Sequence, residues 1–108
     1  MSRRPATSDV YLAIADPTRR ALLDVLGAGE QTVLGLARPF EMTLSAVSQH
    51  LKLLLAVGLV RFRKAGRQRY YRLNAKPLRE VADWVGHYKR FWQEKLDALH
   101  DHLDRNPT

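Results

Sequence analysis

The chain of 108 residues contains no cysteine, which excludes disulfides, thiolate metal sites and thiol redox sensing. The longest apolar run, residues 53–60, is far shorter than the roughly 20 residues that a membrane-spanning helix needs. The charged N-terminus is followed by no apolar segment of the kind found in signal peptides. Nucleophile elbows, phosphate loops and metalloprotease spacings are also absent. We therefore expect a cytoplasmic protein that is not an enzyme, uses no cofactor and binds no membrane.

Acidic residues are missing from one long block. The net charge is +7 and the sequence pI is about 10.3, which makes a polyanion the leading class of partner. No Asp or Glu lies between Met42 and Arg79, whereas nine of the 18 Lys and Arg residues do. Such a distribution predicts one positive face rather than a generally basic surface.

Residues 42–59 form the stretch around which the rest of the chain is organised. Apolar residues recur there at helical spacing and suit a core: Val47, Leu51, Leu54 and Leu55. Another side of the same helix carries short or amide-bearing groups: Ser45, Ser48 and Gln49, followed by Lys52. A helix that lies against base edges needs side chains that allow close approach and that form hydrogen bonds.

Shorter helices are predicted before this stretch. Residues 9–14 favour a first helix, and Asp16 followed by Pro17 is a good start for a second, which ends near Gly27 and Gly29. A third helix covers 33–38 and is stopped by Pro39, and Thr43 provides the N-cap of the next. The short connection at 39–42 predicts a helix-turn-helix over residues 33–57.

A change of period after Gly58 predicts a β-hairpin over residues 60–73. Apolar and basic residues alternate over 60–63, residues 68–73 are β-prone with Tyr71 and Leu73 on one face, and Gly66 lies at the turn. Residues 61–72 hold six Arg or Lys and no acid. We expect a basic wing.

The last predicted helix covers residues 77–104 and carries a long apolar stripe. At about 1.5 Å per residue it is roughly 40 Å long, more than a small domain can cover, so we expect it to pack against a second copy. The expected homodimer interface consists of Tyr11, Val81, Trp84, Val85, Tyr88, Phe91, Trp92, Leu96, Leu99 and Leu103. The aromatic residues of this set are alternatively the lining of an apolar ligand pocket.

The predicted architecture is mainly α with a small β-hairpin (α+β). A single winged helix-turn-helix domain over residues 9–104 would include the long C-terminal dimerisation helix. A flexible N-terminal arm is expected at residues 1–8 and a frayed tail at 105–108.

Three segments resemble the ArsR-type (arsenic-repressor-like) family of bacterial transcriptional regulators: ADPTRRALLDVL at 15–26, LARPFEMTLSAVSQHLKLLLAVGLV at 36–60 and GRQRYYRL at 66–73. The C-terminal pattern from Trp84 is similar to a branch of that family without the metal-binding cysteines. The resemblance implies a homodimer that represses from a palindromic operator on double-stranded DNA and is released by a signal such as a small-molecule inducer. Residues 33–38 lack the family's cysteine motif, and Gly35 stands where members often carry Glu.

Together, the acid-free block and the resemblance assign DNA contacts. The candidates for base edges are Leu44, Ser45, Ser48 and Gln49. The candidates for phosphates or the minor groove are Arg19, Arg20, Thr43, His50, Lys52, Arg63, Lys64, Arg67 and Arg69. Some have alternative roles: Thr43 as a cap only, His50 in packing, and Arg20 paired with an acid inside the protein.

Acidic and histidine side chains on the last helix suggest a different switch. Asp83 and His87 share a helix face, as do Asp97 and His100. Two antiparallel copies could combine one pair from each chain into a zinc or nickel site, with His102 as a further ligand. The alternatives to a specific repressor are therefore a metal-responsive repressor, a winged-helix protein-interaction module and a nonspecific DNA-coating protein.

Overall fold

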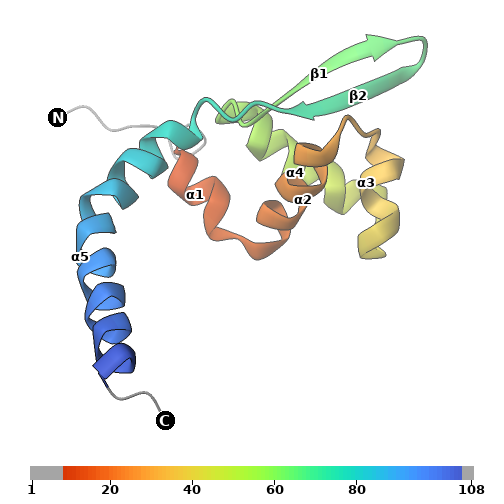
Figure 1. The fold of residues 1–108 in the computed structure, drawn as a ribbon. Helices are drawn as coiled ribbons and strands as arrows, with labels where there is room; N and C mark the ends of the chain where they lie inside the picture. Colours follow the sequence, from red (N-terminus) through yellow and green to blue (C-terminus); the bar gives the residue numbers. More distant parts are fainter. Residues whose placement is uncertain (1–8, 106–108) are drawn as a thin grey trace, which may run out of the picture. The chain divides into compact units, whose positions relative to one another are not determined.

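The computed structural model describes residues 9–105 and contains five helices and two strands in that range. They are, in chain order, α1 (Val10–Ala15), α2 (Pro17–Ala28), α3 (Val33–Phe40), α4 (Leu44–Ala56), β1 (Val60–Ala65), β2 (Gln68–Leu73) and α5 (Leu78–Arg105) (Figure 1). The chain divides into two compact units, Met1–Leu78 and Arg79–Thr108. The predicted α+β class and the winged helix-turn-helix order are confirmed. The single domain over residues 9–104 stays a prediction.

The expected arm at residues 1–8 and the tail at 106–108 lie outside the described residues. Arg105, which was assigned to the tail, is the last residue of α5.

Short polar side chains begin the first four helices. Asp9, Asp16, Thr32 and Thr43 have extended backbones, and each side chain accepts a hydrogen bond from a backbone N–H in the first turn of the helix that follows. These bonds satisfy N–H groups that have no partner inside the helix. In α2 the cap is followed directly by Pro17, whose missing N–H costs nothing at that position.

The predicted end of the third helix is wrong. The helix α3 continues through Pro39 to Phe40, instead of stopping at Arg38. The proline lies in the last turn, so only one helical hydrogen bond is lost there. The turn is closed afterwards, because Glu41 adopts a left-handed φ of 53° and Met42 N–H donates to the Ala37 carbonyl at 3.2 Å. The connection between α3 and α4 is therefore shorter than expected.

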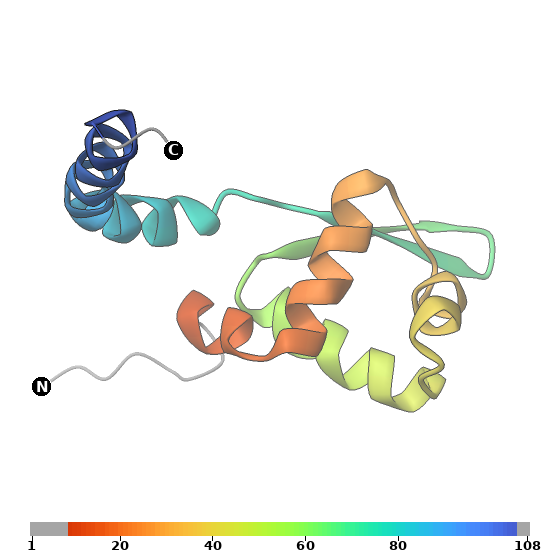
Figure 2. The ribbon, with the colours of Figure 1, turned by 60° about the horizontal axis from the view of Figure 1, so that its bottom comes forward.

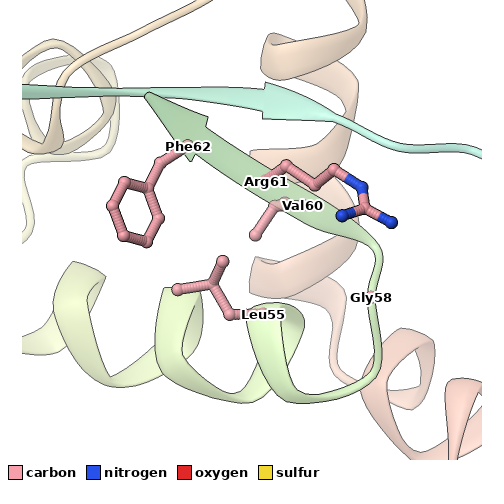
Figure 3. A pocket seen from close by; sticks show the side chains of 5 residues that line it. All are labelled: Leu55, Gly58, Val60, Arg61 and Phe62. Atoms are coloured by element: carbon pink, nitrogen blue, oxygen red, sulfur yellow. The ribbon is translucent and has the colours of Figure 1, made fainter. Parts of the chain in front are cut away.

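The core of the first unit is formed by the buried faces of α2, α3 and α4 together with the base of the hairpin. Its fully buried large side chains are Leu22, Leu36, Leu51, Leu54, Leu59, Val47 and Val60. Figure 2 shows α2, α3 and α4 grouped around this region. The predicted core face of α4 is confirmed at Val47, Leu51 and Leu54. Leu55 is only half-buried and lines a surface pocket with Gly58, Val60, Arg61 and Phe62 (Figure 3).

The predicted hairpin is present and antiparallel, and its register places Phe62 opposite Tyr71 and Val60 opposite Leu73. Gly66 has a φ of 63°, which suits the two-residue turn between the strands. The loop between α2 and α3 adds to the sheet, because Gln31 and Tyr71 exchange two backbone hydrogen bonds of 3.0 and 2.8 Å. The wing is therefore attached to the chain segment that precedes the helix-turn-helix.

The helix α5 has no buried residue along its 28 positions. Its large apolar side chains are between 49% and 61% exposed: Trp84, Tyr88, Phe91, Trp92, Leu96, Leu99 and Leu103. Val81 and Val85 are half-buried. The predicted apolar stripe is thus present on one helix. No helix among the described residues is long and apolar enough to cross a membrane.

Candidate nucleic-acid interface

The exposed side of α4 carries the side chains that were predicted to contact bases. Leu44 is 51% exposed, and Ser45, Ser48 and Gln49 are exposed as well. Ser45, Ser48 and Gln49 occupy the side of the helix away from its buried leucines, because core and surface alternate with the helical period. Leu44 precedes Leu51 by two helical turns and is exposed at the N-terminal end of the core side. An amide, two hydroxyls and one aliphatic group provide donors, acceptors and an apolar contact, which is the chemistry needed in a major groove.

Thr43 and Lys52 lie at the two ends of this exposed side. The Thr43 hydroxyl accepts a hydrogen bond from Ala46 N–H at 3.1 Å, so its role as a cap is confirmed. The residue is nevertheless exposed, and its hydroxyl hydrogen remains available to donate. The exposed Lys52 follows one helical turn after Ser48 and places a positive charge on the same side. A phosphate contact from either residue stays a prediction.

His50 contacts α2 and does not belong to the exposed side of α4. The residue is half-buried, and its Nδ1 lies 3.5 Å from Nη1 of Arg19. The guanidinium of Arg19 also donates to the carbonyls of Ala13 at 2.7 Å and Leu12 at 3.0 Å. Arg19 therefore connects the end of α1 to α4, and this favours the packing alternative for His50.

Arg20 also joins α2 to the end of α1, through an exposed side chain. Its Nη1 donates to the carbonyls of Ile14 at 2.7 Å and Ala15 at 3.2 Å. The carbonyls at the end of α1 would otherwise have no partner, and cationic donors suit that position. Within residues 9–105 the partners of Arg20 are these carbonyl oxygens, and no acid pairs with it there.

Asp16 is the acidic group closest to this cluster in the chain. Its Oδ2 accepts a hydrogen bond from Arg19 N–H at 2.9 Å. This hydrogen bond, aided by the charges of Arg19 and His50, lowers the pKa of Asp16 below its ordinary value, although partial burial opposes the shift. The carboxylate is thus held ionised where α2 begins.

The wing carries two kinds of basic side chain. Lys64 and Arg67 are exposed near the turn and, with Gly66, Gln68 and Arg69, line a hollow of about 390 Å³. Arg69 also lies over the ring of Phe62, with 4.6 Å between the guanidinium carbon and the ring centroid. This basic tip fits a narrow, electronegative groove.

Arg63 differs from the other wing cations. Its Nε lies 3.0 Å from Oε2 of Glu30 in a salt bridge, and its guanidinium stacks over Tyr70. The hydrogen bonds to the Glu30 carboxylate raise the pKa of Arg63 further above its ordinary value. The predicted phosphate contact of Arg63 therefore competes with an existing carboxylate partner.

The four metal candidates on α5 do not form a site within one chain. In the described residues no group of three or more His, Cys, Asp and Glu side chains could hold a metal ion. His100 Nε2 lies 3.5 Å from Asp104 Oδ2, and Asp97 accepts a hydrogen bond from Gln93. Asp83 and His87 are exposed on the same helix. A shared site between two copies stays a prediction.

Several residues that position the interface were not identified from the sequence. Glu30 holds Arg63, and Gln31 extends the sheet. Asn74 closes the base of the hairpin, since its Nδ2 donates to the Gly58 carbonyl at 2.7 Å and its N–H donates to the Leu59 carbonyl at 2.8 Å. No pattern in the sequence singled out Glu30, because the acid directly before the acid-free block is Glu41.

Comparisons with known proteins agree with this geometry. A helix-turn-helix domain family matches residues 14–62. The HTH-type transcriptional regulator Rv2034 of Mycobacterium tuberculosis is 36% identical over 104 residues, which cover 96% of this chain and 94% of that protein. The transcriptional repressor SdpR of Bacillus subtilis is 33% identical over 78 residues, covering 72% of this chain and 87% of the relative.

Solved structures give the same result. An ArsR-like transcriptional regulator from Rhodococcus sp. RHA1 is 30% identical and superposes with a TM-score of 0.69, covering 89% of this chain and 88% of that one. A crystal structure of an ArsR family transcriptional regulator has the same TM-score of 0.69 at 35% identity, and covers 86% of this chain and 97% of the other. The exposed face of α4, the basic wing and these similarities together establish that the chain belongs to the ArsR family of winged helix-turn-helix, DNA-binding transcriptional regulators.

Proposed function

We propose that the protein is a homodimeric repressor that binds a palindromic operator through α4 and the wing. One observation carries this proposal: the exposed side of α4 presents short and amide-bearing side chains, and no acid follows it until after Arg79. Phosphates of a duplex would meet basic groups on both sides of that helix. A cytoplasmic location and a regulatory rather than enzymatic role are part of the same proposal.

The apolar stripe of α5 supports dimerisation. A helix of 28 residues is about 42 Å long, and seven of its large apolar side chains are about half exposed. A continuous row of exposed apolar side chains on a single chain is characteristic of an interaction surface. A second copy is the simplest partner, because two identical stripes can bury each other around a two-fold axis.

A two-fold axis also explains the choice of a palindromic operator. Two copies of α4 would enter successive major grooves about 34 Å apart, and each wing would contact the adjacent minor groove. The side chains of Leu44, Ser45, Ser48 and Gln49 would read bases. Thr43, Lys52 and the basic wing tip would contact phosphates, which fix the register without reading sequence.

Binding to the DNA upstream of the protein's own gene tests the proposal. Fluorescence anisotropy would compare this region with a scrambled duplex of equal length and composition. We expect the natural region to bind at least about 1,000-fold more tightly, and both affinities to fall steeply as salt rises. Equal affinities would instead indicate nonspecific DNA coating.

The same titration tests the metal-responsive alternative when it is repeated with zinc, with nickel and after chelation. An unchanged affinity across these conditions would remove the alternative that uses Asp83, His87, Asp97 and His100.

A further inference from the structure

A carboxylate from outside the wing holds one of the wing's arginines with three hydrogen bonds. Nε of Arg63 donates to Oε2 of Glu30 at 3.0 Å and to Oε1 at 3.3 Å, and Nη2 donates to Oε1 at 3.1 Å. Both carboxylate oxygens are therefore engaged by one guanidinium. Bidentate pairs of this kind constrain orientation more strongly than single contacts between point charges.

The pair connects three parts of the DNA-binding unit. Glu30 is followed by Gln31, whose backbone pairs with Tyr71 of β2. The next residue, Thr32, caps α3. Arg63 belongs to β1, and its guanidinium carbon lies 4.8 Å from the ring centroid of Tyr70 on β2. The ion pair thus fastens both strands of the wing to the segment at which the helix-turn-helix begins.

The same ion pair also distinguishes Arg63 from the other basic side chains of the wing. Within residues 9–105 the structure gives a salt bridge to Arg63, and none to the other five basic residues of the hairpin, Arg61, Lys64, Arg67, Arg69 and Arg72. A phosphate that approaches Arg63 must displace a carboxylate already bound to it. The other five cations carry no such cost.

We propose that Glu30 is a positioning residue for DNA recognition: it fixes the wing through Arg63 and withholds that arginine from the DNA phosphates. This inference rests on the proposed placement of the wing on DNA. It assigns Arg63 a role in specificity through wing orientation, in place of the phosphate contact predicted from its charge. Removing Glu30 would then free a cation, so that general DNA affinity rises while discrimination falls.

The salt dependence of binding separates the two roles of Arg63. The logarithm of the DNA affinity falls linearly with the logarithm of the salt concentration, and each phosphate neutralised adds about 0.9 to the steepness of this fall. This steepness is the slope compared between variants. We expect Arg63→Ala to leave the slope unchanged on both duplexes and to reduce the ratio of operator to scrambled affinity. Glu30→Gln should increase the slope by about one and tighten binding to the scrambled duplex several-fold. In the Glu30→Gln background, Arg63→Ala should return the slope to the wild-type value.

Two controls accompany these variants. Asp24→Asn removes an exposed acid from the middle of α2 and leaves the Glu30–Arg63 pair intact, so its slope and ratio should stay near those of the wild type. The exchanged pair Glu30→Arg with Arg63→Glu rebuilds the ion pair in reverse. It should recover the operator preference that either single charge reversal loses. Thermal unfolding of each variant tests whether it is folded. We expect all variants to fold, because an exposed ion pair contributes little to stability.

A fall of about one in the slope for Arg63→Ala alone would overturn the inference, because it would show that Arg63 binds phosphate. An unchanged slope for Glu30→Gln, or failure of the exchanged pair to restore preference, would also overturn it. The slopes can be measured on the scrambled duplex alone. The outcome is therefore distinguishable from a failure of the repressor proposal, which would appear as equal wild-type affinities for the two duplexes.

Discussion

Nη1 of Arg19 lies 3.5 Å from Nδ1 of His50, so the first turn of α2 contacts α4, the helix that we propose reads DNA. The same guanidinium caps the carbonyls of Leu12 and Ala13. Nδ1 of His50 accepts a hydrogen bond from this guanidinium in the tautomer that carries the ring hydrogen on Nε2. Arg19 thus acts inside the protein as a clamp between helices.

Replacing Arg19 is expected to cost stability rather than DNA charge contacts. Arg19→Ala loses two hydrogen bonds from a charged donor and should lower the free energy of unfolding by about 1–2 kcal/mol. Arg20→Ala, the matched control, removes contacts that are exposed and should cost less. Urea unfolding measures both. At temperatures where the variants are folded, a slope of DNA affinity against salt reduced by about one for Arg19→Ala would instead support the phosphate contact.

Asp16 predicts a pH dependence of stability. Its pKa is lowered in the folded protein, so its ionised form contributes stability above about pH 4, and this is lost as pH falls through the lowered value. Asp16→Asn keeps a capping side chain but removes the charge. We expect the variant to melt below the wild type at neutral pH and the difference to shrink towards about pH 2. Asp24→Asn, on the exposed middle of α2, is the control. A difference that does not depend on pH would contradict the assignment.

Gln49 and Lys52 should affect DNA binding differently. Gln49→Ala removes a base-edge amide and should weaken operator binding by about 1–3 kcal/mol, while binding to the scrambled duplex changes little. Lys52→Ala should weaken both duplexes by a similar factor and reduce the salt slope by about one. Anisotropy titrations of the two variants on both duplexes provide the comparison. Equal loss on both duplexes for Gln49→Ala would remove it from the base-reading set.

Gly58 directs the chain from α4 into the wing with a φ of 79°. A Cβ there would lie 3.7 Å from Pro77 Cγ, an ordinary contact, so the cost of Gly58→Ala comes from backbone conformation and should be about 1–2 kcal/mol. Gly27→Ala is a close control, because its Cβ would also meet its nearest neighbour, Leu73 Cδ2, at 3.7 Å, but within a helix. There the substitution should be neutral or stabilising. Equal melting temperatures for the two variants would contradict this reasoning.

Charge within the α5 stripe should prevent dimerisation. Leu99→Glu places a carboxylate where the side chain is 55% exposed in one chain and would be buried between two. We expect a monomer by sedimentation, with weaker binding to a full operator and unchanged binding to an isolated half-site. Arg90→Glu introduces the same group on the opposite side of the helix and should remain dimeric. A dimeric Leu99→Glu protein would place the interface elsewhere.

Local patterns in the sequence determined most of the secondary structure. Asp9, Asp16 and Thr43 cap helices because their side chains bond to N–H groups only two or three residues away. The core face of α4 follows from an apolar period of 3.6, and the strands of the hairpin follow from an alternation with period 2. Pro39 misled the prediction, because proline terminates a helix interior but is tolerated in a last turn that the following residues close.

Only the tertiary structure decided what the basic residues do. In the sequence Arg19, Arg20, Arg63 and Arg67 are equivalent positive charges. Folding brings Arg63 to a carboxylate 33 residues away and Arg19 to an imidazole 31 residues away, while Arg67 stays at the exposed wing tip. A local pattern carries no information about such distant partners, because they depend on how α2, α4 and the wing pack together. The sequence alone therefore determined that one block of the chain is basic and free of acids, and the packing determined which of its cations are already engaged by partners inside the protein.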